Sequence, residues 1–205
     1  MSITENESAA PYETGVIHGR FQILHRDHLK YLLAGKKLCR HLVVGITNPD
    51  PILTRENNAD PHRSTKEYNP LSYYERFGLI RDALFEAGVR LDEFTIVPFP
   101  INLPELYGCY VPLDAVFFLS IYDEWGKKKQ ETFLKLGLKI HVLWEVPIEE
   151  KGIKGSEVRE AIAKDLPWEH LVPPSVAETL KKGDIPYRLK RQQTEYINSL
   201  LLRNG

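Results

Sequence analysis

Residues Thr14 to His28 read TGVIHGRFQILHRDH, and this stretch decides the fold. Its first half, Thr14 to Phe21, is a short apolar run that ends in glycine and polar residues, which is typical of a buried strand. Asp27 to Leu38 follows with leucines at helical spacing, which predicts a helix with Asp27 as its N-cap. His41 to Thr47 (HLVVGIT) predicts a second buried strand, and a strand-helix-strand unit implies parallel pairing.

The rest of the chain continues this alternation. Further strands are predicted at Phe94–Pro98, Ala115–Leu119 and Lys139–Trp144, and further helices at Leu71–Ala87, Tyr122–Leu136, Ser156–Lys164, Pro174–Lys182 and Tyr187–Leu202. Gly88 is expected at the C′ position of the helix that ends at Ala87. The order predicts an α/β fold, a doubly wound parallel sheet with C-terminal helices, in which ligands bind at the carboxyl ends of the strands. We expect a polar, disordered lead-in over 1–12, one domain over 13–185 and a C-terminal helix over 186–205.

Composition excludes several classes of protein. Hydrophobic residues make up 42% and charged residues 27% of 205 residues, a mix typical of a soluble globular domain. The net charge of -1 argues against a nucleic-acid partner, and no apolar run reaches the length of a membrane span. Cys39 and Cys109 form neither a disulfide framework nor a zinc-ligand spacing, which favours free thiols in the cytoplasm.

The turn after the first strand has the chemistry of an anion site. A helix N-terminus presents free backbone N–H groups and the positive end of a dipole, which suits a phosphate. Gly19 lets the backbone approach a ligand closely, and Arg20, His25 and His28 can donate hydrogen bonds to phosphate oxygens. Taken alone, two histidines three residues apart are as easily solvated helix-end residues or metal ligands. Their position after a glycine-arginine-phenylalanine turn favours phosphate.

A second anion site is predicted in Lys151 to Arg159 (KGIKGSEVR), where glycine and a hydroxyl precede a helix. Ser156 can cap this helix or donate to a phosphate, and Arg159 lies one turn further on. Alone, this pattern describes an ordinary capped helix. Two such sites at the ends of two crossover units could grip one triphosphate from both sides.

Four motifs together resemble a known family. GRFQILHRDH starts at Gly19, NPLSYYER starts at Asn69, KGSEVR runs from Lys154 to Arg159, and WEHLVP starts at Trp168. In this order they resemble nucleotidyltransferases with a HIGH-type signature, most of all archaeal-type nicotinamide-nucleotide adenylyltransferases. The resemblance implies a Rossmann-like fold and Mg²⁺ held mainly by the triphosphate, with no dedicated metal ligands. It implies a phosphate-contacting role for Arg20, His25, His28, Arg76 and Arg159, of which Arg20, His25, His28 and Arg159 are expected to be catalytic. We expect the nucleotide to be bound by Gly19, Arg20, Phe21, His25, His28, Lys154, Gly155, Ser156 and Arg159.

The sequence departs from the family where the acceptor should bind. Asp27 replaces the glycine between the signature histidines, and Tyr107 stands in the region where the archaeal enzymes stack a tryptophan on nicotinamide. The loop from Asn48 to Pro70 is long and carries four cationic or imidazole side chains, Arg55, His62, Arg63 and Lys66. We expect Arg76, Tyr107 and Arg63 to bind the acceptor, although the loop could also be a solvated insertion.

The resulting hypothesis is transfer of a nucleoside monophosphate, from ATP by default, to a small phosphorylated acceptor with release of pyrophosphate. Nicotinamide mononucleotide is the default acceptor. The changes at the positions expected to bind it predict that the protein uses nicotinamide mononucleotide poorly, or uses another acceptor better. The alternative within the class is a cytidylyl or adenylyl transferase for another small phosphate or phosphonate. Outside the class stand a nucleotide-binding regulator without turnover and a relative of class I aminoacyl-tRNA synthetases, which would need a tRNA-binding extension. The expected partners are these small molecules, with no nucleic acid and no membrane. We expect a cytoplasmic protein that could form a homo-oligomer.

Overall fold

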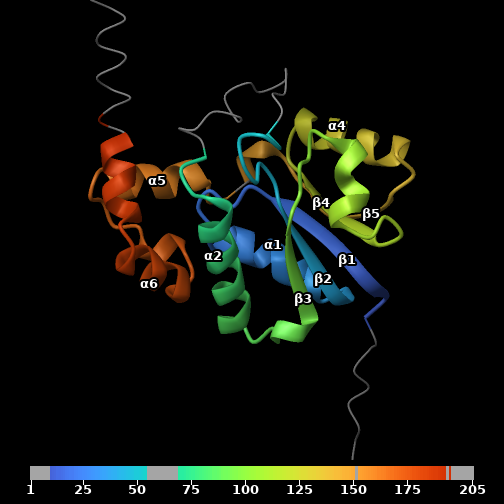
Figure 1. The fold of residues 1–205 in the computed structure, drawn as a ribbon, viewed down its shortest axis with the longest axis horizontal. Coiled ribbons are helices and arrows are strands. Elements are labelled where there is room, and N and C mark those ends of the chain that lie inside the picture. Colours follow the sequence, from blue (N-terminus) through green and yellow to red (C-terminus); the bar gives the residue numbers. More distant parts are fainter. Residues whose placement is uncertain (1–9, 55–68, 151, 193, 195–205) are drawn as a thin grey trace, which may run out of the picture.

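The structure is a computed structural model that describes residues 10–54, 69–150, 152–192 and 194. At the centre of this part lies a five-stranded sheet in the order β3-β2-β1-β4-β5, with each neighbouring pair parallel. The strands are β1 (Tyr12–Gly19), β2 (Cys39–Ile46), β3 (Phe94–Pro98), β4 (Val116–Ile121) and β5 (Lys139–Glu145) (Figure 1). The predicted doubly wound parallel sheet is confirmed.

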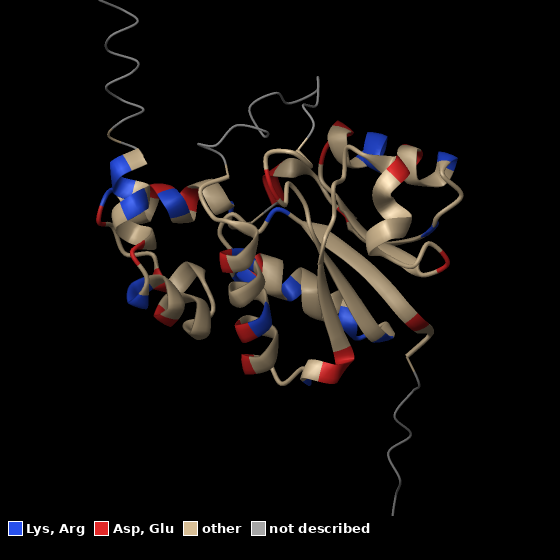
Figure 2. Ribbon diagram, viewed as in Figure 1, with Lys and Arg blue, Asp and Glu red and all other residues tan. Residues whose placement is uncertain are grey.

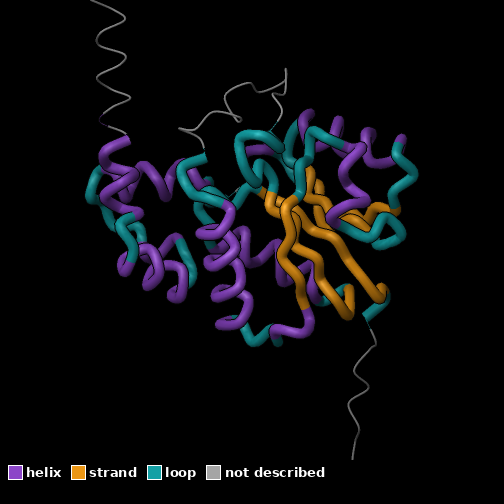
Figure 3. Tube along the Cα trace, in the orientation of Figure 1, coloured by secondary structure: helices purple, strands orange, loops and turns teal. Residues whose placement is uncertain are grey.

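Helices cover both faces of the sheet (Figure 3). Successive strand residues point to opposite faces, so Val16 and Ile17 of β1 enter two different apolar clusters. The helices α1 (Arg26–Lys36) and α2 (Tyr73–Glu86) pack in the cluster of Ile17, whereas α3 (Tyr107–Tyr110) and α4 (Glu124–Lys135) pack in the cluster of Val16. Lys, Arg, Asp and Glu lie mostly on the helices and loops around the sheet (Figure 2).

The order of the strands fixes where a ligand can bind. From β1 the chain moves outward through β2 and β3, and then crosses back to β4 and β5 on the other side. The strand order therefore reverses between β1 and β4. In open α/β sheets the crevice outside the carboxyl ends of the strands at such a reversal is the usual binding site.

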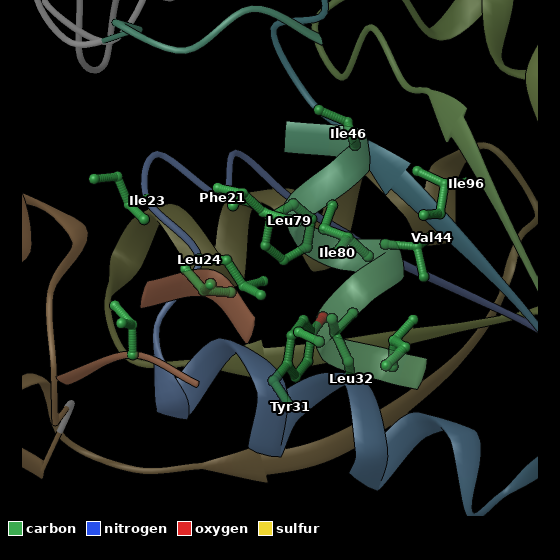
Figure 4. Packing of buried hydrophobic residues seen from close by; sticks show 14 of the residues in the cluster. Phe21, Ile23, Leu24, Tyr31, Leu32, Val44, Ile46, Leu79, Ile80 and Ile96 are labelled. Atoms are coloured by element: carbon green, nitrogen blue, oxygen red, sulfur yellow. The ribbon is translucent and has the colours of Figure 1, made fainter. Parts of the chain in front are cut away.

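The C-terminal part packs against α2. It contains α5 (Gly155–Ala163), α6 (Pro174–Lys182) and a further helical stretch over 185–192. Val158, Leu180 and Leu189 from these helices belong to the same apolar cluster as Leu79 and Ile80 of α2. Figure 4 shows Leu79 and Ile80 in this cluster. The single-turn 3-10 helices are η2 (Leu91–Glu93), η3 (Pro104–Leu106), η4 (Ile148–Glu150) and η5 (Glu169–Leu171).

Most predicted boundaries differ from the structure by one or two residues. β1 ends at Gly19, before the predicted end, because Phe21 adopts a positive φ of 52° and turns the chain away from the sheet. The helix predicted from Leu71 starts at Tyr73, since Ser72 and Glu75 form a capping box. Gly88 has the positive φ of 84° expected of a C′ glycine.

Some predictions fall outside the described residues. These are the lead-in up to residue 9, the loop over 55–68 with its cationic side chains, and the end of the C-terminal helix. Within the described residues, no helix has the length and apolar character needed to cross a bilayer.

Candidate active site

An open cavity of about 410 Å³ lies at the predicted crevice. Its walls come from the end of β1 and the start of α1, from the end of β4 and the start of α4, and from the segment that leads into α5. All the residues predicted to bind the nucleotide line this one cavity: Gly19, Arg20, Phe21, His25, His28, Lys154, Gly155, Ser156 and Arg159. The two predicted anion sites are therefore two walls of the same pocket.

The turn after β1 is held rigidly. Phe21 is fully buried beneath it, and a Cβ on Gly19 would lie 2.9 Å from the Phe21 ring, so only glycine fits there. The buried side-chain amide of Gln22 donates to the Leu71 carbonyl at 2.9 Å and accepts from the Leu71 N–H at 2.9 Å. This pair of hydrogen bonds fixes the turn to the segment that precedes α2.

His25 and His28 form the start of α1. His25 is the N-cap, and its Nδ1 accepts a hydrogen bond from the backbone N–H of His28 at 3.3 Å. The two rings stack with centroids 3.6 Å apart, and His28 also meets the edge of Phe21. The prediction that Asp27 caps this helix is wrong, because the imidazole of His25 takes that role.

Asp27 instead connects the two walls. Its Oδ2 accepts a hydrogen bond from the backbone N–H of Ile153 at 2.6 Å. A Cβ on Gly152 would lie 2.2 Å from the same oxygen, so glycine is what allows the chain to come this close. The Asp27 carboxylate thus binds the loop before α5 and lies in the first turn of α1, where negative charge is stabilised.

The start of α5 lies directly on the turn after β1. A Cβ on Gly155 would lie 2.7 Å from the Gln22 carbonyl oxygen, which leaves no room for a side chain. Arg159 donates to that same carbonyl through Nη1 and lines the cavity. Backbone N–H groups at the N-terminus of α5 therefore face the same space as the start of α1.

Two residues expected to bind the acceptor lie elsewhere. Arg76 is 1% exposed, and its guanidinium donates to the backbone carbonyls of five residues: Arg20, Thr47, Asn48, Pro49 and Ser72. Burial, followed by the charge of Arg20, lowers the pKa of Arg76 to about 10, so it stays charged at neutral pH. This geometry gives Arg76 a structural role, because its hydrogen bonds hold together the turn after β1, the segment after β2 and the N-terminus of α2.

Tyr107 is the second of these residues. It is 2% exposed, packs on Phe99 and Phe133, and donates its hydroxyl proton to the Ile101 carbonyl at 2.6 Å. Burial raises its pKa. The ring belongs to the core beneath α4 and lies outside the cavity lining, so the expected stacking on an acceptor does not occur in this geometry. Arg63, the third predicted acceptor residue, lies outside the described residues.

Apart from Gly19, none of the predicted site residues lies on the wall formed by β1, β4 and α4, although Ser120 to Tyr122 replaces a motif of the family that the sequence resembles. This wall contains His18, Ser120, Tyr122, Asp123, Trp125 and Lys129. The Trp144 indole N–H donates to the Tyr122 hydroxyl at 2.6 Å, and the Lys129 ammonium lies 4.7 Å from the Trp125 ring centroid. The strand order reverses between β1 and β4, and that reversal marks this wall as a binding site. The order itself is known only from the structure.

Two carboxylates line the cavity and could contact a metal that is bound to a phosphate ligand. Among the described residues, no three His, Cys, Asp or Glu side chains gather closely enough to hold an ion. The carboxylates in the lining, Asp27 and Asp123, accept backbone hydrogen bonds from Ile153 at 2.6 Å and Gly126 at 2.8 Å. Mg²⁺ commonly binds through substrate phosphates with one or two carboxylates, and this donor set fits that arrangement.

Comparisons with known proteins agree with this geometry. No known family model matches the chain. It is 50% identical over 177 residues to a phosphonoformate cytidylyltransferase from Streptomyces viridochromogenes, covering 86% of this chain and 95% of that protein. It is 28% identical over 187 residues to a nicotinamide-nucleotide adenylyltransferase from Thermococcus onnurineus, covering 90% and 91%. The resemblance inferred from the motifs is confirmed.

The solved structures agree on the fold. A bifunctional NMN adenylyltransferase/ADP ribose pyrophosphatase from Francisella tularensis superposes with a TM-score of 0.66 at 14% identity. The match covers 95% of this chain and 57% of that longer chain. At this level of identity the similarity establishes the fold alone, and it confirms the Rossmann-like α/β architecture.

Proposed function

Because this chain belongs to the HIGH-type nucleotidyltransferases, we propose that it transfers CMP from CTP to a compact phosphonate or phosphate acceptor, with release of pyrophosphate. The observation that carries the choice of nucleotide and acceptor is the 50% identity to a phosphonoformate cytidylyltransferase along 95% of its length. This identity favours cytidylyl transfer to a small phosphate or phosphonate over adenylyl transfer to nicotinamide mononucleotide.

The cavity supports the same choice. Tyr107, which stands in the region expected to stack on a flat neutral ring, is part of the core. The wall formed by β1, β4 and α4 carries Lys129, His18 and Ser120 beside the aromatic side chains of Tyr122 and Trp125. Of these, Lys129 with the donors His18 and Ser120 suits a small acceptor with several negative charges.

The proposed reaction is an in-line displacement at the α-phosphorus. An anionic oxygen of the acceptor forms a bond to this phosphorus as the bond to the bridging oxygen of pyrophosphate breaks. The acceptor oxygen already carries its electron pair and charge near neutral pH, so no proton must be removed and no general base is required. Catalysis then depends on positioning and on stabilisation of charge on the phosphates.

The residues of the cavity divide this work. The N-termini of α1 and α5 direct backbone N–H groups toward one space, where they would hold the triphosphate from two sides. His25 and His28 would donate to the transferring and leaving phosphates, and Arg20 and Arg159 would hold the phosphate chain. A Mg²⁺ ion held mainly by the triphosphate would neutralise charge that develops on the leaving group.

Adenylyl transfer to nicotinamide mononucleotide is the second candidate. It is favoured by 28% identity to a nicotinamide-nucleotide adenylyltransferase over 90% of the chain. The cytoplasmic location, the Mg²⁺ requirement and the oligomeric state remain predictions.

The test is pyrophosphate release by the purified full chain with each of ATP and CTP, crossed with nicotinamide mononucleotide, phosphonoformate and methylphosphonate, with products identified by mass spectrometry. A parallel series with EDTA tests the metal requirement. We expect a CMP-phosphonate product from CTP and little product from nicotinamide mononucleotide. A kcat/KM of about 10⁴ M⁻¹s⁻¹ or more for ATP with nicotinamide mononucleotide, the lower end of ordinary enzyme efficiency, would make the second candidate the function.

A further inference from the structure

One buried histidine beside the cavity is not used by the mechanism above. His18 lies on β1 immediately before Gly19, is 5% exposed and lines the cavity. Neither of its ring nitrogens has a hydrogen-bond partner among the residues that the structure describes. Buried polar groups in folded proteins are almost always hydrogen-bonded, so an imidazole with two unsatisfied nitrogens at a cavity wall points to a ligand.

The packing of His18 holds it in place for such a contact. Its ring lies between Phe99 and Phe133, with centroid distances of 5.4 and 5.5 Å. A half-turn of the ring exchanges its nitrogen and carbon positions, and this orientation is assigned from hydrogen bonds, which His18 lacks among the described residues. Phe99 and Phe133 pack against the ring, and His18 also lines the cavity.

The positive charge of Lys129 beside His18 favours a negatively charged ligand. Lys129 of α4 lines the same wall and is close enough for its charge to act on the imidazole. Burial, followed by the charge of Lys129, lowers the pKa of His18, so the ring is neutral at neutral pH and keeps one N–H donor. A neutral N–H donor and an ammonium group together favour an anionic oxygen.

The position of this pair separates it from the triphosphate. His18 and Lys129 come from β1 and α4, whereas the residues assigned to the triphosphate come from the starts of α1 and α5. Figure 1 shows α4 and α5 on opposite sides of the carboxyl ends of the strands. An acceptor that attacks the α-phosphorus must lie between these two walls, with its far end toward α4.

We propose that His18 and Lys129 bind a second anionic group on the acceptor, the one that does not attack. This inference rests on the proposed function and makes it more specific. The acceptor class becomes a short molecule with a phosphonate or phosphate at one end and a carboxylate or second phosphonate at the other. An acceptor with a single anionic group leaves His18 unsatisfied and binds more weakly.

The test compares two acceptors that differ only in the second charge. Calorimetric titration of the full chain, preloaded with a non-hydrolysable CTP analogue and Mg²⁺, gives Kd for phosphonoformate and for methylphosphonate. We expect phosphonoformate to bind at least tenfold more tightly, and His18→Phe and Lys129→Met each to remove most of that preference. Lys129→Arg should retain it, and Lys128→Met is the matched control because Lys128 is exposed on the same helix and outside the cavity lining.

The outcomes separate the two proposals. An unchanged preference in both His18→Phe and Lys129→Met, with melting temperatures close to wild type, overturns this inference and leaves cytidylyl transfer intact. Failure of wild type to bind either acceptor overturns it as well. If His18→Phe does not fold, Lys129→Met decides alone. Pyrophosphate release that is absent with every nucleotide and acceptor rejects the proposed function even where the charge preference in binding is found.

Discussion

The carboxylate of Asp27 and the backbone N–H of Ile153 are joined by a 2.6 Å hydrogen bond that connects the two ends of the chain's active-site cavity. Asp27 belongs to the first turn of α1, and Ile153 precedes α5, so residues 126 positions apart are fixed to one another. Gly152 makes the approach sterically feasible. The N-termini of α1 and α5 are thereby held beside the same cavity, where we propose that they bind one triphosphate.

Asp27→Ala should weaken this connection and lower kcat/KM for the nucleoside triphosphate by about tenfold, since a hydrogen bond to a charged group contributes about 1.5–3 kcal/mol. Asp27→Asn retains an acceptor oxygen at the same place and should lie nearer to wild type. The effect should appear mainly in KM for the triphosphate, because Asp27 positions the α5 wall and touches no reacting atom in our scheme. Steady-state kinetics of both variants checks this, and equal kinetics for Asp27→Ala and wild type would remove the positioning role.

Substitution of the stacked histidines should lower turnover. We expect His28→Ala to lower kcat by about 10²-fold or more, the usual scale for loss of one preorganised donor to a transition-state anion. His25 is also the N-cap of α1 and only 4% exposed, so His25→Ala should in addition cost about 1 kcal/mol of folding free energy. His25→Asn can cap the helix without an imidazole and therefore separates the two effects.

Single-turnover kinetics together with thermal unfolding measures both quantities. Near wild-type kcat in both His28→Ala and His25→Asn would contradict the catalytic assignment. A loss of activity in His25→Ala that His25→Asn restores would show that capping alone is what His25 contributes.

The residues that we propose hold the triphosphate could be predicted to line one cavity because their sequence signals are local. These residues lie within two short segments, Gly19 to His28 and Lys154 to Arg159, in which a strand or loop is followed by a helix. Helix N-termini and their donors follow from such local patterns. The strands followed in the same way from apolar runs, and β3 was predicted with the observed bounds.

The wall proposed to bind the acceptor, formed by β1, β4 and α4, could not be assembled from sequence because it depends on strand order. His18 reads as one more residue of a buried strand until β4 is placed beside β1 and brings α4 over it. Arg76 and Tyr107, predicted to bind the acceptor, show the converse case, because the structure buries both. Both residue types suit a binding site, but only tertiary packing reveals that their polar groups are satisfied by carbonyls of the protein itself.

Arg159→Lys should weaken triphosphate binding. Arg159 donates to the Gln22 carbonyl and lines the cavity, so its fork can span the loop and a phosphate at once, which a lysine cannot do. We expect KM for the triphosphate to rise by about tenfold, the effect of one lost charged hydrogen bond, with a smaller change in kcat. Titration with a non-hydrolysable analogue gives the same comparison without turnover, and unchanged affinity would reject the phosphate contact.

Arg76→Lys should destabilise the fold without a selective effect on the acceptor. A lysine keeps the charge but cannot satisfy five carbonyls from one position. We expect a loss of about 2–4 kcal/mol in unfolding free energy, seen as a drop of about 5–15 °C in Tm. At a temperature where the variant is folded, a large rise in acceptor KM at unchanged Tm would instead support the acceptor-binding role.

Two glycines on different helices should respond in opposite directions to the same substitution. Gly155→Ala places a methyl group 2.7 Å from the Gln22 carbonyl oxygen, a backbone atom that cannot move aside, so α5 must shift away from the turn after β1. We expect lower Tm and at least tenfold lower kcat/KM, because misplacement of a positioning element by about 1 Å can cost 10²-fold in rate.

Gly78→Ala is the matched control. Gly78 lies inside α2, and a Cβ there meets nothing within 4 Å. Alanine in a helix interior is favoured over glycine by about 0.5–1 kcal/mol, so Tm should rise by about 1–4 °C at unchanged activity. Differential scanning calorimetry and pyrophosphate release on both variants make the comparison. Equal activity of Gly155→Ala and Gly78→Ala would mean that the close contact of α5 with Gln22 is not needed to assemble the triphosphate site.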